Sequence, residues 1–207
     1  MNALQIFDAM RPLSRLPSSA RRHRRPDIDT GMLPVITVKA ALLVACLVLT
    51  GCLGMPDKVS PVTGFELQKY LGKWYEIARL DHSFERGLTR VSAEYSLRDD
   101  GGVAVINRGY SQQDAQWKQA EGKAYFVNGP DEGYLKVSFF GPFYGSYVIF
   151  ELDREEYQYA FVSGPDLSYL WLLSRKPDLE AEVIDRFVSR AKQLGYDTAQ
   201  LIFVEQE

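Results

Sequence analysis

The sequence predicts an all-β protein, an eight-stranded antiparallel up-and-down β-barrel with one C-terminal α-helix packed outside it and a short final strand. Three observations predict this fold. Short runs of alternating or aromatic-rich residues recur after residue 65, with Asp, Gly and Pro punctuation between them. No helical pattern interrupts these runs, which makes a parallel sheet with crossover helices unlikely. A single stretch with helical spacing follows the last of the eight runs.

The eight predicted strands are short and evenly spaced. Turn signals separate them, the clearest being residues 99–102, 128–131, 141–142 and 164–166. An eight-stranded barrel is just wide enough to hold one small ligand. The expected strands are 74–81, 91–98, 103–111, 117–127, 134–140, 144–153, 157–163 and 169–175.

The helix is predicted to begin at Pro177 and Asp178, because proline suits the first turn of a helix. Gly195 is predicted to end it, since glycine readily adopts the left-handed conformation of a C-cap. A last strand is expected at 201–204. The apolar residues at helical spacing between these limits are Leu179, Val183, Phe187, Val188, Ala191 and Leu194.

Composition limits the choice of function. The chain has 207 residues, 46% of them hydrophobic, which fits one globular domain or at most two. Its two cysteines exclude a disulfide-dense scaffold. Residues 1–51 have an excess of Lys and Arg, whereas the remainder is acidic. An acidic main body argues against nucleic acid as a partner.

The N-terminus, residues 1–51, is predicted to be an N-terminal extension and a signal peptide that is removed. A lysine, Lys39, precedes an apolar run that is too short to span a membrane. An initiation site at Met32 would give a signal peptide of ordinary form. Export through the twin-arginine route is the alternative explanation of the arginines at 21–25, although they lie far from the apolar run.

The apolar run ends in Leu49-Thr50-Gly51-Cys52, which resembles the bacterial lipobox. That resemblance implies that Cys52 is lipidated and becomes the first residue of the mature chain. A plain signal peptide with an incidental cysteine is the alternative. Leu53 follows the cysteine, and by resemblance to bacterial lipoproteins this indicates a lipid-anchored protein at the periplasmic face of the cell outer membrane. Residues 52–64 are expected to form a lipidated tether, and residues 65–207 the barrel domain.

Three motifs in order indicate a family. Gly72-Lys73-Trp74 opens the first predicted strand, Gly164-Pro165-Asp166 lies between the seventh and eighth, and Arg175 ends the eighth. They resemble the three conserved blocks of the lipocalins, over residues 65–207. Together with the lipobox, the chain resembles a bacterial lipocalin of the outer-membrane lipoprotein type. The resemblance implies a structural pair, Trp74 and Arg175, with the guanidinium over the indole at the closed end of the barrel.

The same resemblance implies a fatty acid or lysophospholipid ligand in the barrel, for lipid storage or transport in the cell envelope. If Arg175 points inward, strand alternation places Trp171 in the cavity, and filling of the core is the alternative role. Glu76 shares the inward parity of Trp74, with a bulge or a rim position as alternatives. The residues predicted to line the ligand cavity are Trp171, Tyr95, Tyr110, Tyr125, Phe139 and Tyr147.

The sequence gives no indication of an enzyme. His82 is the one histidine outside the N-terminal segment, and no second base or nucleophile accompanies it. We therefore expect no catalytic residue, no metal site and no cofactor. Two alternatives to ligand transport stay open. One is a structural envelope lipoprotein whose barrel is filled by its own side chains, and the other is a lipocalin enzyme of the isomerase type.

Four aromatic residues bracket Gly141-Pro142, between the fifth and sixth predicted strands. In an up-and-down barrel this connection lies at the end opposite Trp74. Alternation can bury only about half of these rings, so one or two should stay exposed. The hairpin 139–144 is therefore predicted to be the ligand entrance and to contact a membrane or, in a homodimer, a second copy of the chain.

Overall fold

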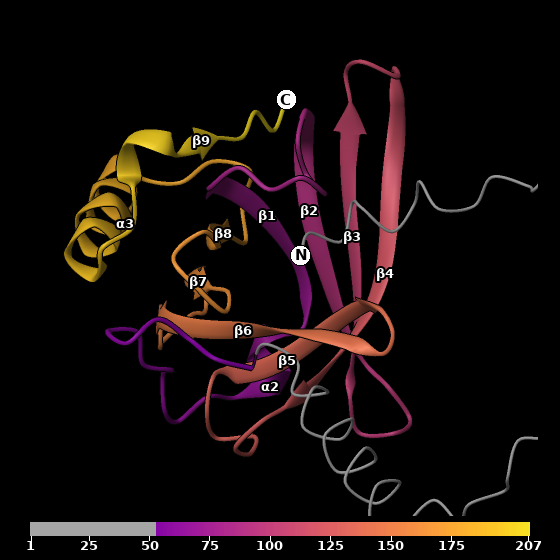
Figure 1. Ribbon diagram of the computed structural model, residues 1–207, viewed down its shortest axis with the longest axis vertical. Helices are drawn as coiled ribbons and strands as arrows, with labels where there is room; N and C mark the ends of the chain where they lie inside the picture. The colour runs from indigo at the N-terminus through magenta and orange to yellow at the C-terminus, as the bar shows by residue number, and fades with distance from the viewer. Residues whose placement is uncertain (1–52) are drawn as a thin grey trace, which may run out of the picture. The chain divides into compact units, whose positions relative to one another are not determined.

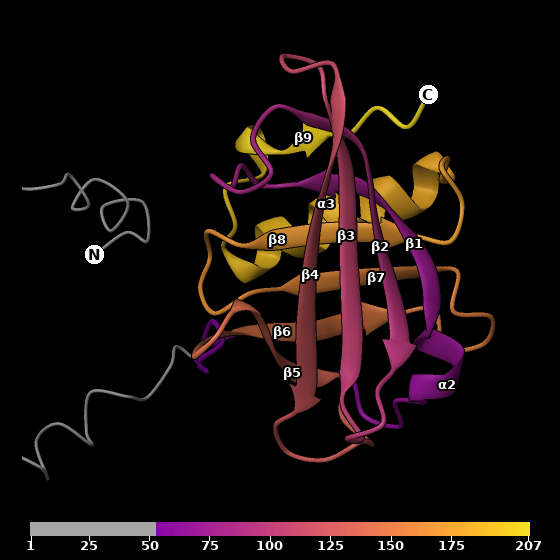
Figure 2. The same cartoon turned by 90° about the vertical axis from the view of Figure 1, so that its right-hand side faces the viewer.

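A computed structural model describes residues 53–207, which form one closed antiparallel barrel. The strands follow one another in sequence order around the wall, and β1 pairs with both β2 and β8, so the sheet closes on itself. Figures 1 and 2 show this wall with α3 lying outside β7 and β8. The predicted eight-stranded barrel with an outer helix and a short last strand is confirmed.

The elements lie close to their predicted positions, and β3 and β5 have the predicted bounds. The strands are β1 Gly72–Arg79, β2 Leu88–Leu97, β3 Val103–Ser111, β4 Gln116–Phe126, β5 Tyr134–Phe140, β6 Phe143–Leu152, β7 Tyr159–Ser163, β8 Leu170–Ser174 and β9 Ile202–Phe203. The helices are α2 Leu67–Tyr70, α3 Ala181–Leu194 and the 3-10 turn η2 Thr198–Gln200.

Alternation along the strands divides the core into two clusters. On β8, Trp171 and Leu173 face the barrel interior, whereas Leu170 and Leu172 face outward and pack beneath Phe187 of α3. This is the parity that the inward position of Arg175 predicts. The wall is therefore buried on both sides here, which explains the nearly continuous apolar sequence of β8.

Helix α3 covers the outer face of the barrel with the predicted apolar stripe. Phe187, Ala191 and Leu194 are buried against the wall, and Gly195 ends the helix with a φ of 100°. The predicted start at Pro177–Asp178 is wrong by about one turn, since the first helical residue is Ala181. Glu180 is the N-cap, with extended backbone, and its carbonyl accepts the first helical hydrogen bonds.

The closed end of the barrel is held by Arg175. Its guanidinium carbon lies 3.9 Å from the centre of the Trp74 ring, as predicted. The same guanidinium donates to the backbone carbonyls of Lys73 (2.9 Å), Lys69 (2.6 Å) and Tyr157 (3.3 Å). One side chain thereby ties together β1, α2 and the β6–β7 turn beneath a fully buried indole.

The seam between β1 and β2 is completed by the C-terminal segment 202–206, which we call the tail. Direct pairing of β1 with β2 covers only the first half of β1. Beyond it, the backbone N–H of Val204 donates to the Ile77 carbonyl (2.9 Å), and the backbone N–H of Arg90 donates to the Glu205 carbonyl (2.7 Å). The Gln206 amide bridges the two strands by donating to carbonyls on each. The tail is thus part of the wall.

The predicted signal peptide and lipidated Cys52 lie outside the described residues. Within residues 53–207, every helix falls short of the length and apolarity that a membrane span requires. The tether is ordered from Leu53 onward and crosses the outer face of the barrel, where the Tyr134 hydroxyl donates to the Leu53 carbonyl. Met55 and Val59 pack against the outer core cluster.

We expect deletion of residues 201–207 to lower the free energy of unfolding by about 2–4 kcal/mol, because several hydrogen bonds worth about 1 kcal/mol each are lost. Urea denaturation followed by circular dichroism measures this. Deletion of Glu207 alone is the control and should leave the midpoint unchanged. An unchanged midpoint in the longer deletion would mean that the tail is not part of the wall.

Candidate functional site

The candidate site is the barrel interior, where four of the six predicted ligand-binding residues lie. Tyr95 is buried in the interior cluster, and Tyr147, Phe139 and Trp171 pack against it. They come from β2, β6, β5 and β8, and so from both halves of the wall. Their rings surround an apolar interior that Val103, Val105, Leu135 and Ile149 complete.

The other two predicted residues, Tyr110 and Tyr125, are a correction, because both face outward. Tyr110 packs at 5.6 Å from the Trp117 ring and beneath Arg90, away from the interior cluster. The Tyr125 hydroxyl donates to Asp100 at 2.9 Å on the surface. Strand alternation explains both positions. Val105 of β3 and Ala124 of β4 face inward, and Tyr110 and Tyr125 lie an odd number of residues away from them, so they face outward.

A chain of phenol groups crosses the interior just above Trp74. The Tyr147 hydroxyl lies 2.7 Å from that of Tyr70 and 2.9 Å from that of Tyr95. The Tyr70 ring contacts Trp74 with the ring centres 4.7 Å apart and the planes tilted by 33°. Burial raises the pKa of all three tyrosines above its usual range, so the phenols stay neutral. This layer forms a hydrogen-bonded floor under the apolar interior.

A buried ion pair lies higher in the barrel. Glu76 points inward, as its parity with Trp74 predicts, and accepts a hydrogen bond of 2.7 Å from Arg79. Both side chains are almost completely buried. A β-bulge between Glu76 and Ala78 shifts the register against β8, so that Arg79 lies opposite Trp171 and also faces inward. The bulge therefore brings a carboxyl and a guanidinium together inside the wall.

Glu85 completes this polar cluster from the β1–β2 connection. Its carboxylate accepts a hydrogen bond of 3.1 Å from the Trp171 indole, and its backbone carbonyl accepts one of 2.9 Å from Arg79. Arg79 also donates to the Leu88 carbonyl. The cluster thus holds the connection across the upper part of the barrel and fixes the orientation of Trp171.

Two carboxyls share one guanidinium in this cluster. Burial raises the pKa of Glu76 well above its usual range, and the neighbouring Glu85 raises it further, although Arg79 opposes this. Burial also raises the pKa of Glu85. Two buried negative charges beside one positive charge are costly, so both shifts favour the protonated form of these carboxyl groups.

His82 lies within a stack of aromatic rings at the open end of the barrel. Its ring is parallel to those of Phe84 (5.2 Å) and Tyr169 (5.0 Å) and lies 4.7 Å from Trp171. The stack joins the β1–β2 and β7–β8 connections. Burial, with Arg79 nearby, lowers the pKa of His82 to about 4, so the imidazole is neutral at physiological pH.

Three buried polar atoms of this interior have no hydrogen-bond partner among residues 53–207. They are Arg79 Nε, His82 Nε2 and Asn107 Oδ1. Asn107 pairs across the sheet with Ala93, which packs against the interior cluster. A buried donor or acceptor without a partner costs about 1–3 kcal/mol, so such atoms commonly mark a place where a ligand binds.

Arg79, His82 and Glu85 were missed by the sequence analysis as site residues. Strict alternation places Arg79 outward, and only the bulge reverses this. Glu85 belongs to the β1–β2 connection, where no strand alternation predicts which side chains face inward. The one available signal was an arginine three residues after Glu76 in an otherwise apolar strand. No group of three or more His, Cys, Asp or Glu side chains within 53–207 is arranged to hold a metal ion.

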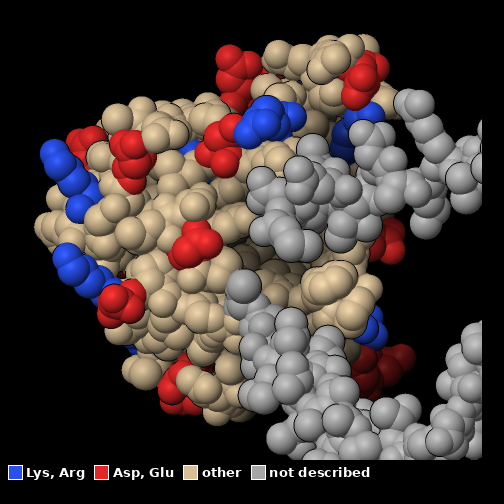
Figure 3. Space-filling view, viewed as in Figure 1, with Lys and Arg blue, Asp and Glu red and all other residues tan. Residues whose placement is uncertain are grey.

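The open end carries exposed apolar side chains on each of its connections. Phe140 and Phe143, beside Gly141-Pro142, are 79% and 71% exposed, whereas Phe139 faces inward. The expectation that some rings of this hairpin stay exposed is confirmed. Phe84, Trp117 and Leu167 are exposed on or beside the other three connections. Charged side chains are dispersed over the face seen in Figure 3, between broad areas of uncharged residues.

Comparison with known proteins decides the family. Residues 65–206 match the model of the lipocalin-like domain. The chain is 64% identical over 171 residues to the outer membrane lipoprotein Blc of Vibrio cholerae, an alignment that covers 82% of this chain and 100% of that protein. The chain belongs to the lipocalin family. It is of the Blc type, since the Blc protein of Escherichia coli K12 is also 50% identical, over 84% of this chain and 97% of that protein.

More distant lipocalins share the fold. Temperature-induced lipocalin-1 of Arabidopsis thaliana is 34% identical over 68% of this chain and 78% of that protein. Insecticyanin from Manduca sexta superposes with a TM-score of 0.59 at 24% identity, covering 73% of this chain and 86% of that chain. The predicted lipid-anchored localisation in the outer membrane agrees with the names of the Blc relatives. A lipocalin barrel with an apolar interior is suited to hydrophobic ligands.

We expect the His82→Phe variant to lose less free energy of unfolding than the parent when the pH is lowered. Because folding lowers the pKa of His82 to about 4, the unfolded chain binds the proton more tightly, and stability falls as the pH falls from about 6.5 to about 4. The phenyl ring keeps the stack and cannot titrate. The variant should therefore lose about 2 kcal/mol less than the parent across this window, measured by urea denaturation at each pH.

His82→Gln is the companion variant, since it also cannot titrate but lacks the aromatic ring. It should show the flatter pH profile with a lower stability at every pH. Asp81 and Asp166 oppose the shift of His82 and are unchanged in both variants. A parent-like acid profile in both variants would show that another group causes the loss.

Proposed function

We propose that this lipocalin binds a fatty acid or a lysophospholipid in its barrel and stores or transports it within the cell envelope. The observation that carries the proposal is the division of the interior. Apolar side chains and a floor of phenols occupy the closed half, whereas Arg79 Nε and His82 Nε2, which are buried without partners, lie nearer the open end. A ligand with an acyl chain and a polar head matches this division.

The acyl chain supplies the affinity in this proposal. Burial of each CH₂ group contributes about 0.8 kcal/mol. Val103, Val105 and Leu135, with the inner faces of Phe139 and Tyr147, offer the apolar contacts. Tyr95 adds a ring at the level of the phenol floor, which limits how deep the chain can reach.

The polar cluster fixes the head group. Arg79 Nε is a donor, and His82 Nε2 offers a further position for a hydrogen bond. Because Glu76 already pairs with Arg79, the cluster suits the zwitterionic head of a lysophospholipid or the protonated carboxyl group of a fatty acid, neither of which adds a buried net charge. The proposal includes no step that makes or breaks a covalent bond.

The membrane supplies the ligand in this proposal. Cys52 carries the lipid anchor, and the tether from Leu53 to residue 64 keeps the barrel within reach of the bilayer. The hairpin of β5 and β6 is the entrance, since Phe140 and Phe143 are exposed at its tip. A second copy of the chain is the alternative partner for the same hairpin.

A barrel filled by its own side chains is the second candidate, in which the protein is a structural lipoprotein. It is favoured by the closed half, where Tyr70, Trp74 and Tyr95 already contact one another. Ligand titration separates the two candidates.

We expect Trp171→Ala to weaken binding of a long-chain fatty acid about tenfold, because the ring lines the interior and orders Glu85. Titration followed by tryptophan fluorescence measures the affinity, and mass spectrometry of co-extracted lipids identifies the natural ligand. Leu97→Ala is the control, since this side chain ends β2 and is 52% exposed. Absence of any saturable binding by the parent would favour the filled barrel.

We expect Phe140→Ser with Phe143→Ser to slow ligand uptake from vesicles several-fold while leaving thermal stability nearly unchanged, because exposed rings contribute little to the core. Stopped-flow transfer of a fluorescent fatty acid measures uptake. Leu97→Ser, at an exposed position on the β2–β3 turn, is the control. The entrance assignment fails if the double variant is strongly destabilised while uptake and oligomeric state stay as in the parent.

A further inference from the structure

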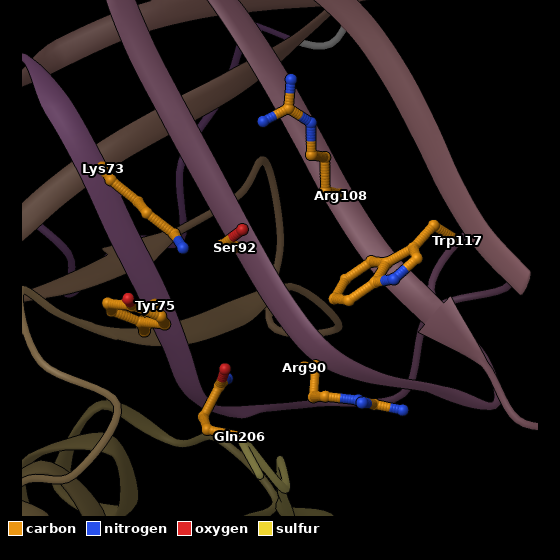
Figure 4. A pocket seen from close by; sticks show the side chains of 7 residues that line it. All are labelled: Lys73, Tyr75, Arg90, Ser92, Arg108, Trp117 and Gln206. Carbon is orange, nitrogen blue, oxygen red and sulfur yellow. The ribbon is translucent and has the colours of Figure 1, made fainter.

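A cavity lies on the outside of the barrel, apart from the proposed lipid site. It has a volume of about 260 Å³ and lies across the outer faces of β1, β2, β3 and β4. We call it the basic side cleft. Figure 4 shows its lining, which consists of Lys73, Tyr75, Arg90, Ser92, Arg108, Trp117 and Gln206.

Strand alternation explains why these side chains gather outside the wall. Trp74 points into the barrel, so its neighbours Lys73 and Tyr75 point out. Ser92 pairs with Tyr75 on one side and with Arg108 on the other, which places three strands side by side at one level. The tail closes the cleft where β1 and β2 part, because the Gln206 amide is fixed to both strands.

The cleft concentrates positive charge on an otherwise acidic domain. Lys73, Arg90 and Arg108 enter it from three different strands. Among residues 53–207, the one ion pair that these cations form is between Arg108 and Glu94, at 3.6 Å and largely exposed. The Lys73 ammonium instead lies 4.3 Å from the centre of the Tyr75 ring. Lys73 and Arg90 therefore form no ion pair among residues 53–207, although Glu94 lies opposite Lys73 in the pairing of β1 with β2.

Arg90 is held in place without using its hydrogen-bond donors. Its guanidinium carbon lies 4.1 Å from the centre of the Tyr110 ring and 5.5 Å from that of Trp117. Its side chain donates no hydrogen bond within the described residues, and its Nε is buried without a partner. The backbone adopts a φ of 52° at a bulge in β2, a costly conformation for a residue other than glycine. The fold thus places this guanidinium in the cleft even though the backbone conformation of Arg90 is energetically unfavourable.

We propose that the basic side cleft binds a phosphate group of an anionic ligand. Guanidinium and ammonium groups, with the Ser92 hydroxyl, are the donors that bind phosphate oxygens in proteins. The aromatic rings of Tyr75 and Trp117 offer apolar contacts to a non-polar part of the same ligand. The phosphate belongs either to a phospholipid head group or to a free anion, and the lipid anchor favours the first source. The inference does not depend on what the barrel interior binds.

The test uses the full chain in non-ionic detergent and probes without acyl chains, which have no reason to enter the apolar barrel. Phosphorus NMR titrations measure binding of glycerophosphoglycerol, the head group of phosphatidylglycerol, and of inorganic phosphate. Lys73→Gln with Arg108→Gln should weaken binding about tenfold, since each lost charge removes a charge-assisted contact. Lys176→Gln with Lys192→Gln removes the same charge from exposed positions elsewhere and should have no effect.

Each outcome bears on the proposal. Binding of glycerophosphoglycerol alone supports it with a lipid head group as the source, and binding of both probes supports it with phosphate as the sufficient element. In both cases the affinity must fall as the salt concentration rises. The proposal is overturned if neither probe binds, or if the two double variants weaken binding equally. Circular dichroism of every variant confirms that the barrel is intact.

Discussion

The contact of Arg175 with Trp74 is the interaction on which the closed end depends. A barrel needs its first and last strands to meet. Here one guanidinium at that junction packs against the indole ring and donates hydrogen bonds to three backbone carbonyls. Gly72 lies beside this guanidinium and adopts a φ of 93°, a backbone conformation that favours glycine. These contacts close this end of the barrel.

The bulge in β1 gives the other end its chemistry. Without it, Arg79 would lie on the outer face and Glu76 would be a buried carboxyl with no cation beside it. With it, Arg79 reaches Glu76 and the carbonyls of the β1–β2 connection. One irregular residue in the first strand therefore determines both the polarity of the interior and the path of the connection that borders the open end.

Most of the fold could be predicted from the sequence because alternation and turn residues act locally. The bounds of β3 and β5, the parity of Trp171 and the C-cap at Gly195 follow from such local patterns. The site was harder to predict, since which face of a strand is inside depends on its neighbours. Tyr110 and Tyr125 show this, because aromatic content alone placed them inside although their phase on β3 and β4 is outward.

The tail has a consequence for the order in which the barrel forms. A polypeptide is made and exported from its N-terminus, so β1 is the first strand to appear and residues 202–206 are the last. Yet these two segments are neighbours in the wall. Contacts between residues so distant in sequence form late, because a long loop must close first. The seam beside β1 therefore depends on contacts between segments that lie far apart in the sequence, and such contacts are the slowest to form.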